Sequence, residues 1–141
     1  ISFCPSSNLF IGSGLFNLEQ ATSTGIAVGI GTDVGGGTSF SMLKTLAEGY
    51  KVLQLQGQSL SALKAFYLAT LGGAKALGLD NKIGTLLPGR EADFTVLNFN
   101  ATPLIERRVS MSETLEERLF ILMMLGDERS ISSTHIMGTL S

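Results

Sequence analysis

Residues 26–38 read Ile-Ala-Val-Gly-Ile-Gly-Thr-Asp-Val-Gly-Gly-Gly-Thr, an apolar run that passes directly into a glycine-dense loop. A short apolar run bounded by glycines is typical of a strand buried in a parallel sheet. We expect a helix from about Ser39 to Gln56, capped by Thr38 or Ser39, because apolar residues recur there at steps of three and four. Its predicted buried stripe is Phe40, Leu43, Ala47, Tyr50 and Leu53. Strand, loop and helix together form one β/α unit.

A second unit lies upstream. Residues 1–4 are predicted to form a strand that ends at Pro5, with a loop over 6–14 and a weak helix over 15–24. Beyond the first long helix, a further helix is expected from about Ser61 to Leu71, broken by Gly72-Gly73. Its predicted buried face is Leu63, Phe66, Tyr67 and Leu71.

The pattern changes after residue 80. We expect a strand over Phe94–Leu97 and a strand or hairpin over 131–140, with a turn at Met137-Gly138. Ser110 and Glu113 fit a capping box ahead of a helix that ends near Leu125. The predicted buried face of this helix is Leu115, Leu119 and Leu122.

This order predicts an α/β fold with two parts. Two β/α units leave strand edges unpaired, and a closed (β/α)8 barrel needs about 250 residues. We therefore interpret residues 1–80 as the last two β/α units of such a barrel. Residues 81–141 are interpreted as a small β appendage with an inserted helix at about 110–125.

Composition excludes several classes of protein. The chain has 141 residues, 44% of them hydrophobic and 16% charged, with a net charge of −2. This excludes a disordered tail and the basic footprint of a nucleic-acid-binding protein. A single cysteine excludes an intrachain disulfide, and the longest apolar run, Leu119–Leu125, is too short to span a membrane. The chain opens inside an expected strand without an initiating methionine, so we expect a processed chain or a fragment.

Candidate chemistry lies where the two predicted parallel strands end, since ligands bind at the carboxyl ends of such strands. Ser6, Ser7 and Asn8 follow the first strand, and Asp33 follows the second. Neighbouring strands would place both groups at one mouth. The expected helix begins too far along for Asp33 to cap it, so a functional role is favoured over a turn aspartate.

Other sites are less well supported. The glycine loop lacks the Lys-Ser/Thr ending of a phosphate-binding P-loop. Cys4 and His135 could form a nucleophile pair, but a small buried cysteine and a solvated strand histidine are the favoured interpretation.

Several stretches resemble the guanine deaminase family of the amidohydrolase superfamily. They are Ser2–Phe10, Gly12–Phe16, Gly31–Gly35, Thr38–Leu43, Tyr50–Gly57, Ala69–Ala74, Ile83-Gly84 and Pro88–Phe94. The Gly-Thr-Asp and Pro-Gly-x-x-Ala-Asp motifs are shared across the superfamily. Tyr50–Gln56, which reads Tyr-Lys-Val-Leu-Gln-Leu-Gln, is what points to the guanine deaminases.

This resemblance implies a metal-dependent hydrolase barrel with the C-terminal part of a β-sandwich, in a cytoplasmic and commonly homodimeric enzyme. A zinc-bound water would attack C2 of guanine, releasing ammonia and leaving xanthine. Asp33 would contact the zinc and take a proton from that water, and Ser6, Ser7 and Asn8 would shape the pocket wall. The family also uses four histidines and a glutamate, whereas this chain has one histidine, His135, outside any matching motif. We therefore expect a C-terminal portion that is inactive by itself.

Two other interpretations stay open at this point. One is a different amidohydrolase, a deaminase or chlorohydrolase acting on another ring. The other is a non-catalytic module that associates with itself through its open strand edges and the apolar helix near Leu119–Leu125.

Overall fold

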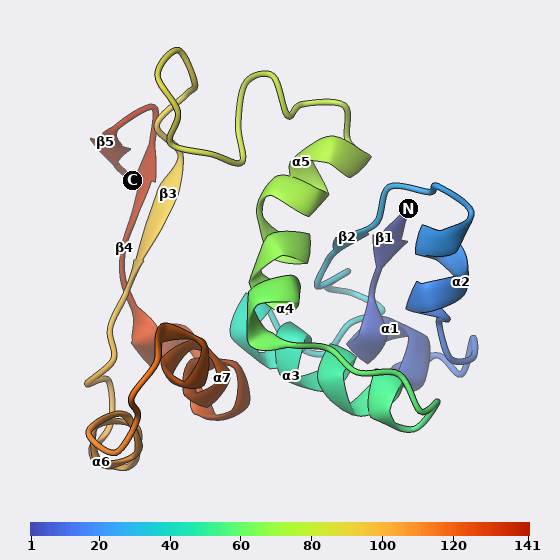
Figure 1. Cartoon of the computed structure of the whole chain (residues 1–141), viewed down its shortest axis with the longest axis horizontal. Coiled ribbons are helices and arrows are strands. Elements are labelled where there is room, and N and C mark those ends of the chain that lie inside the picture. Colours follow the sequence, from blue (N-terminus) through green and yellow to red (C-terminus); the bar gives the residue numbers. More distant parts are fainter.

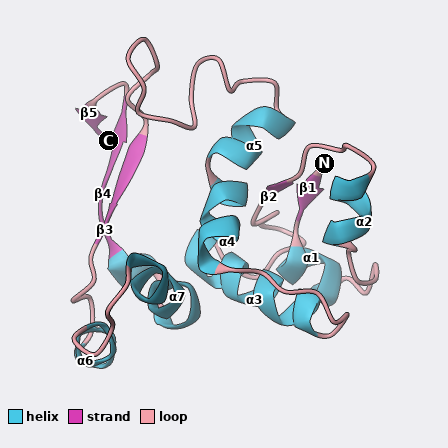
Figure 2. Cartoon of the chain, in the orientation of Figure 1, coloured by secondary structure: helices cyan, strands magenta, loops and turns pink.

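A computed structural model describes all 141 residues and shows a mixed α/β fold with two small, separate sheets (Figures 1 and 2). A parallel pair of strands lies among the first helices, and an antiparallel sheet lies at the other side of the molecule. In chain order the elements are β1 (Ser2–Phe3), α1 (Pro5–Phe10), α2 (Leu18–Ser23), β2 (Gly29–Ile30), α3 (Met42–Gln54), α4 (Ala62–Ala69), α5 (Leu71–Ala76), β3 (Phe94–Leu97), α6 (Pro103–Val109), α7 (Leu115–Leu125), the 3-10 helix η1 (Glu128–Ser130), β4 (Ile131–Ile136) and β5 (Thr139–Leu140).

The parallel pair confirms the two predicted strands, although each is only two residues long. Ser2 lies opposite Gly29, and Phe3 lies opposite Ile30. Both strands end at the same edge, where β1 leads into α1 and β2 leads into the loop that carries Asp33. The sheet therefore brings two distant segments of the chain together.

The main core surrounds this pair. It joins Phe3 and Ile30 to buried side chains of α3 and α4, and Met123 of α7 is part of the same cluster. Strand β2 passes so close to α5 that a Cβ on Gly29 would lie 2.8 Å from the Cα of Gly73. Only glycine allows this approach, which explains the glycine inside an otherwise apolar strand.

Helix α3 begins later than predicted. Its N-cap is Ser41, whose hydroxyl accepts a hydrogen bond from the backbone N–H of Lys44, in place of Thr38 or Ser39. Phe40 therefore precedes the helix, is 86% exposed and does not belong to the buried stripe. Leu43, Ala47 and Leu53 are buried as predicted, whereas Tyr50 is only partly buried and packs against the core.

The second predicted helix is split. Helix α4 ends at Ala69 and α5 begins at Leu71, so the break falls before the glycine pair that was expected to cause it. The predicted face was also wrong at Leu63, which is 51% exposed. The buried face is formed by Ala62, Ala65 and Leu68, because small side chains allow close packing on β2 and α3.

The antiparallel sheet confirms the strand at Phe94–Leu97 and the C-terminal hairpin. Its strand order is β3-β4-β5. Ile136 pairs with Thr139, and Met137 and Gly138 between them have φ values of 51° and 78°. Two successive positive φ angles are typical of the type I′ turn, which suits the twist of a two-residue hairpin.

The region before α7 differs from the prediction. Residues 103–109 form the unpredicted helix α6, which begins with Pro103 in its first turn, and Ser110 lies at its C-terminal end. The capping box is formed by Thr114 and Glu117 rather than by Ser110 and Glu113. Helix α7 packs on α3 and α4, with Leu122 buried as predicted and Leu115 exposed.

Helix α7 thus contributes to the core that surrounds the parallel pair. The boundary near residue 80 coincides with the passage from parallel to antiparallel pairing, but the division into two domains stays a prediction. None of the helices has the length and apolar character needed to cross a membrane.

Candidate functional site

Asp33 lies in the exposed loop that follows β2. Its backbone is left-handed, with a φ of 47°, a conformation that aspartate tolerates better than most residues. Its carbonyl oxygen accepts a hydrogen bond from the backbone N–H of Gly36 at 3.1 Å, which closes a tight turn. Its carboxylate Oδ2 accepts a hydrogen bond from the hydroxyl of Ser7 at 2.7 Å.

Ser7 reaches Asp33 because the segment after β1 is a helix. The sequence predicted a loop over 6–14, which is wrong for residues 6–10 and confirmed for 11–14. Pro5 occupies the first turn of α1, where proline fits without losing a hydrogen bond. The backbone N–H of Asn8 donates to the carbonyl of Cys4 at 2.9 Å and closes this turn. Ser7 is 1% exposed, so its hydroxyl is held in packed surroundings.

The glycines of the loop make room for this contact. A Cβ on Gly36 would lie 2.5 Å from the Ser7 hydroxyl and 3.3 Å from Oδ2 of Asp33. A Cβ on Gly37 would collide with the carbonyl oxygen of Thr32. The loop is therefore glycine-rich because its own backbone and Ser7 approach so closely, a requirement that the sequence pattern alone did not reveal.

The other two predicted pocket residues point elsewhere. The amide of Asn8 donates from Nδ2 to the hydroxyl of Ser13 at 3.0 Å. Ser6 lies in α1 and is buried on the side that faces α3. It lines a cavity of about 630 Å³ together with Thr45 and Glu48 of α3. Of the three residues predicted to form the pocket wall, only Ser7 contacts Asp33.

Cys4 and His135 do not form a nucleophile pair. The Cys4 sulfur lies 3.3 Å from the hydroxyl of Ser2, beside the parallel sheet. The His135 ring belongs to the antiparallel sheet, where it stacks on Phe94 with ring centroids 4.4 Å apart. The favoured interpretation was nevertheless wrong in detail: Cys4 is only partly buried, and His135 is not a solvated side chain, since its Nδ1 is buried without a hydrogen-bond partner.

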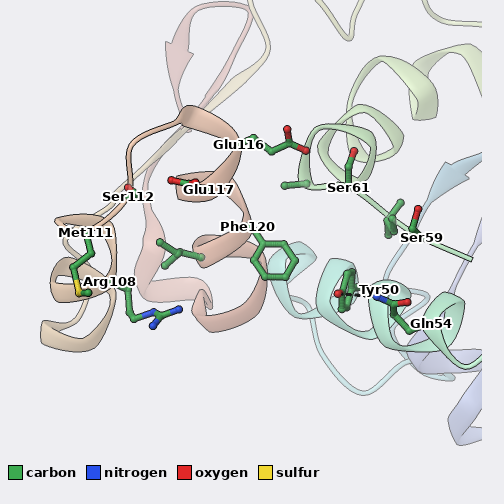
Figure 3. A pocket seen from close by; sticks show the side chains of 13 residues that line it. Tyr50, Gln54, Ser59, Ser61, Arg108, Met111, Ser112, Glu116, Glu117 and Phe120 are labelled. Carbon is green, nitrogen blue, oxygen red and sulfur yellow. Dashed lines mark hydrogen bonds between the residues drawn. The ribbon is translucent and has the colours of Figure 1, made fainter.

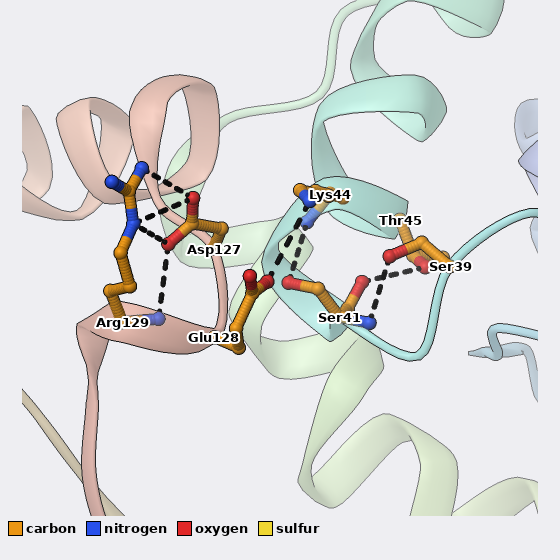
Figure 4. Close-up of polar contacts among 7 residues, drawn as sticks. All are labelled: Ser39, Ser41, Lys44, Thr45, Asp127, Glu128 and Arg129. Carbon is orange, nitrogen blue, oxygen red and sulfur yellow. Dashed lines mark hydrogen bonds and ion pairs between the residues drawn. The ribbon is translucent and has the colours of Figure 1, made fainter.

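A second carboxylate, which the sequence did not single out, has very different surroundings (Figure 4). The guanidinium of Arg129 donates to both oxygens of Asp127, with Nη2 at 2.7 Å from Oδ2. These hydrogen bonds lower the pKa of Asp127 to about 2. Next to it, Lys44 of α3 lies 3.6 Å from Glu128 of η1, so the cluster links α3 to the segment after α7.

A groove of about 650 Å³ lies between the C-terminal part of α3, the start of α4 and α7 (Figure 3). Gln54 donates to the hydroxyl of Tyr50 at 2.8 Å, and the ring of Phe120 meets the Tyr50 ring edge-on. Neither Asp33 nor Ser7 lines this groove. The predicted site residues therefore belong to a different part of the surface.

The donor set of this chain does not form a zinc site by itself. A catalytic zinc takes about three protein ligands. The structure holds no cluster of three histidine, cysteine or acidic side chains placed to bind one ion, and the neighbour of the Asp33 carboxylate is a neutral hydroxyl. Asp33 would be one ligand of an incomplete set.

Comparison with known sequences gives strong matches over the whole chain. The chain is 60% identical to the guanine deaminase of Escherichia coli K12 over 140 residues, which is 99% of this chain and 32% of that protein. It is 39% identical to a probable guanine deaminase of Deinococcus radiodurans over 141 residues, which is 98% of this chain and 32% of the relative. The chain thus spans about a third of the length of the curated relatives it matches.

Solved structures agree with the fold. The E. coli guanine deaminase structure superposes with a TM-score of 0.96 over 99% of this chain and 33% of that one. A guanine deaminase from C. acetobutylicum, solved with guanine in its active site, gives 0.83 at 28% identity and covers 99% of this chain and 33% of its own. The sequence profile of the Amidohydrolase family matches residues 1–140. The chain therefore belongs to the amidohydrolase family.

Proposed function

We propose that this chain is the part of a guanine deaminase that carries the carboxylate at the mouth formed by β1 and β2. One observation carries the proposal: Asp33 follows a buried parallel strand, in the family's Gly-Thr-Asp motif, and its carboxylate is held by Ser7 from the neighbouring unit. Support comes from relatives described as guanine deaminases that match 98–99% of the chain at 31–60% identity.

The proposed reaction adds water to C2 of guanine and releases the exocyclic amino group as ammonia, giving xanthine. Asp33 would accept a proton from the attacking water, since an ionised carboxylate in reach of that water can act as a general base. In the whole enzyme, Asp33 would be the one metal ligand that this chain adds to a set completed by other segments. Ser6 and Asn8 stay predicted pocket residues.

Two finer expectations belong to the same proposal. The parallel units would be the last two of a (β/α)8 barrel, and the antiparallel sheet would be the C-terminal part of a β-sandwich. The open edges of β1–β2 would then pair with strands outside this chain. The cytoplasmic location and the homodimer also stay predictions.

The other interpretations have less support. A 5-methylthioadenosine/S-adenosylhomocysteine deaminase from Teredinibacter turnerae is 34% identical, but only over 69% of the chain. The guanine deaminases match nearly all of it. A different ring substrate is therefore the second candidate, and a purely self-associating module is not favoured.

The test is a chimera in which these 141 residues replace the matching third of E. coli guanine deaminase. We expect the purified chimera to convert guanine to xanthine with release of one ammonia per turnover. The unmodified E. coli enzyme, assayed under the same conditions, is the control. A folded chimera that forms no xanthine would contradict the proposal.

A further inference from the structure

We propose that Ser7 is a positioning residue that holds the Asp33 carboxylate in one orientation, rather than a residue of the pocket wall. This inference rests on the proposed function, because it assigns Ser7 a role through Asp33. It also replaces the expectation that Ser7 lines the substrate pocket.

The direction of the hydrogen bond follows from its partners. An ionised carboxylate only accepts hydrogen bonds, so the Ser7 hydroxyl must donate its single proton to Oδ2 of Asp33. The distance of 2.7 Å is typical of an O–H···O hydrogen bond. With this proton committed and the side chain 1% exposed, Ser7 has no donor left for a substrate.

The difference in burial between the two residues decides which one orients the other. Asp33 is exposed, and its side chain could rotate freely in a surface loop. Ser7 is fixed in α1, which packs on α3. The rigid group therefore orients the mobile one, as supporting residues do around catalytic side chains.

Two further features fit the same role. Oδ1 of Asp33 accepts no hydrogen bond from this chain, so a single donor fixes the carboxylate and leaves one oxygen for chemistry. Gly36 has no side chain that could separate the two groups, and a Cβ there would press on both. The loop is thus built around the Ser7–Asp33 contact.

The first test is Ser7→Ala in the chimera. We expect kcat to fall about 10- to 100-fold, the usual effect of removing a partner that orients a functional ligand. The KM for guanine and the zinc content per chain should stay within about twofold of the unmodified chimera, since the buried Ser7 hydroxyl already donates its proton to Asp33. Ser130→Ala is the matched control, because Ser130 is also fully buried but its hydroxyl has no partner.

Gly36→Ala disturbs the Ser7–Asp33 hydrogen bond from the Asp33 loop, because the added Cβ would press on both groups. It leaves the sequence of α1 unchanged. It should reproduce the fall in kcat. In a double-mutant cycle, Ser7→Ala should cost little once Asp33→Asn is present, because both changes act on one carboxylate.

Crystal structures of the variants give a readout that does not depend on activity. Asp33 should occupy one rotamer in the unmodified chimera and in Ser130→Ala, and more than one in Ser7→Ala. The inference is overturned if Asp33 keeps a single rotamer in Ser7→Ala, if KM alone rises, or if the effects of Ser7→Ala and Asp33→Asn simply add. A chimera that forms no xanthine overturns the proposed function instead, while the rotamer comparison still decides the role of Ser7.

Discussion

Two aspartates in this chain are held in opposite ways. Asp33 accepts one hydrogen bond from a neutral hydroxyl, sits in a left-handed turn and keeps one carboxylate oxygen without a partner in the chain. Asp127 receives guanidinium bonds on both oxygens, and Oδ1 also accepts from the backbone N–H of Arg129. The Asp33 carboxylate thus keeps one oxygen available to other partners, which makes it an open carboxylate. Both oxygens of the Asp127 carboxylate already accept hydrogen bonds, which makes it a saturated carboxylate. The proposed function needs a carboxylate of the first kind, whereas the second is tied to the arginine two residues along the chain.

The elements that carry the two aspartates differ as well. Asp33 follows β2, both residues of which are buried in the main core. Asp127 lies between α7 and β4, in front of a hairpin whose last strand, β5, is exposed along its length. The exposed Asp33 thus follows a buried strand, whereas Asp127, whose side chain is only 14% exposed, lies next to a more exposed part of the chain.

The largest expected effect is on activity, and it tests whether the open carboxylate of Asp33 is sufficient for deamination without the rest of the enzyme. The purified 141-residue chain, free of longer contaminants, should form no xanthine from guanine, because it offers too few ligands for a catalytic zinc. The chimera, which adds the remaining segments, should be active under the same conditions. Xanthine production by the isolated chain would show that this donor set is more complete than the structure indicates.

The packing of β2, the strand before Asp33, can be tested at Gly29. Gly29→Ala would place a Cβ 2.8 Å from the backbone of Gly73, so β2 or α5 must move. Overpacking of this kind costs about 1–3 kcal/mol. We expect a loss of that size in the free energy of unfolding of the chimera, measured in urea, together with a lower kcat as the Asp33 loop shifts.

Gly73→Ala is the matched control on the other side of the same contact. Its Cβ would meet only the carbonyl oxygen of Leu68, at 3.3 Å. It should cost less stability than Gly29→Ala. Equal losses from the two changes would mean that β2 is not tightly seated on α5.

The smallest expected effect is the pH dependence of the saturated carboxylate. The pKa of Asp127 is about 2 in the folded chain, below its ordinary value of 3.8. A lowered pKa means that the bond stabilises the fold fully above the ordinary pKa and loses this contribution as the pH falls towards the folded one. The gap in unfolding free energy between the chimera and its Asp127→Asn variant should therefore shrink from pH 5 to pH 3. A difference in unfolding free energy that grows from pH 5 to pH 3 would mean that the pKa of Asp127 is raised on folding, which would contradict this role.

Much of the candidate site could be predicted, because neighbouring parallel strands end at the same edge of a sheet and bring the residues after them together. The carboxyl ends of two neighbouring parallel strands placed Ser7 and Asp33 at one edge, and their hydrogen bond confirms that proximity. Which of the three polar residues after β1 would face Asp33 depended on α1. Serine and asparagine are weak helix formers, so the short helix was missed, although Pro5 in its first turn was a usable signal.

The remaining errors share one cause: they concern contacts between distant segments. The split between α4 and α5 and the burial of Ala65 in place of Leu63 depend on which elements pack together. Local periodicity predicts that a helix has a buried face, but neighbouring elements decide which side chains fill it.

The most direct test compares Asp33→Asn with Asp127→Asn in the same chimera, measuring kcat for guanine and the free energy of unfolding for each. We predict that Asp33→Asn lowers kcat by about 10²- to 10⁴-fold, the usual contribution of a general acid or base, with little change in stability. We predict that Asp127→Asn lowers stability and leaves kcat nearly unchanged. Full activity in Asp33→Asn, or the same fall in kcat from both changes, would contradict the account.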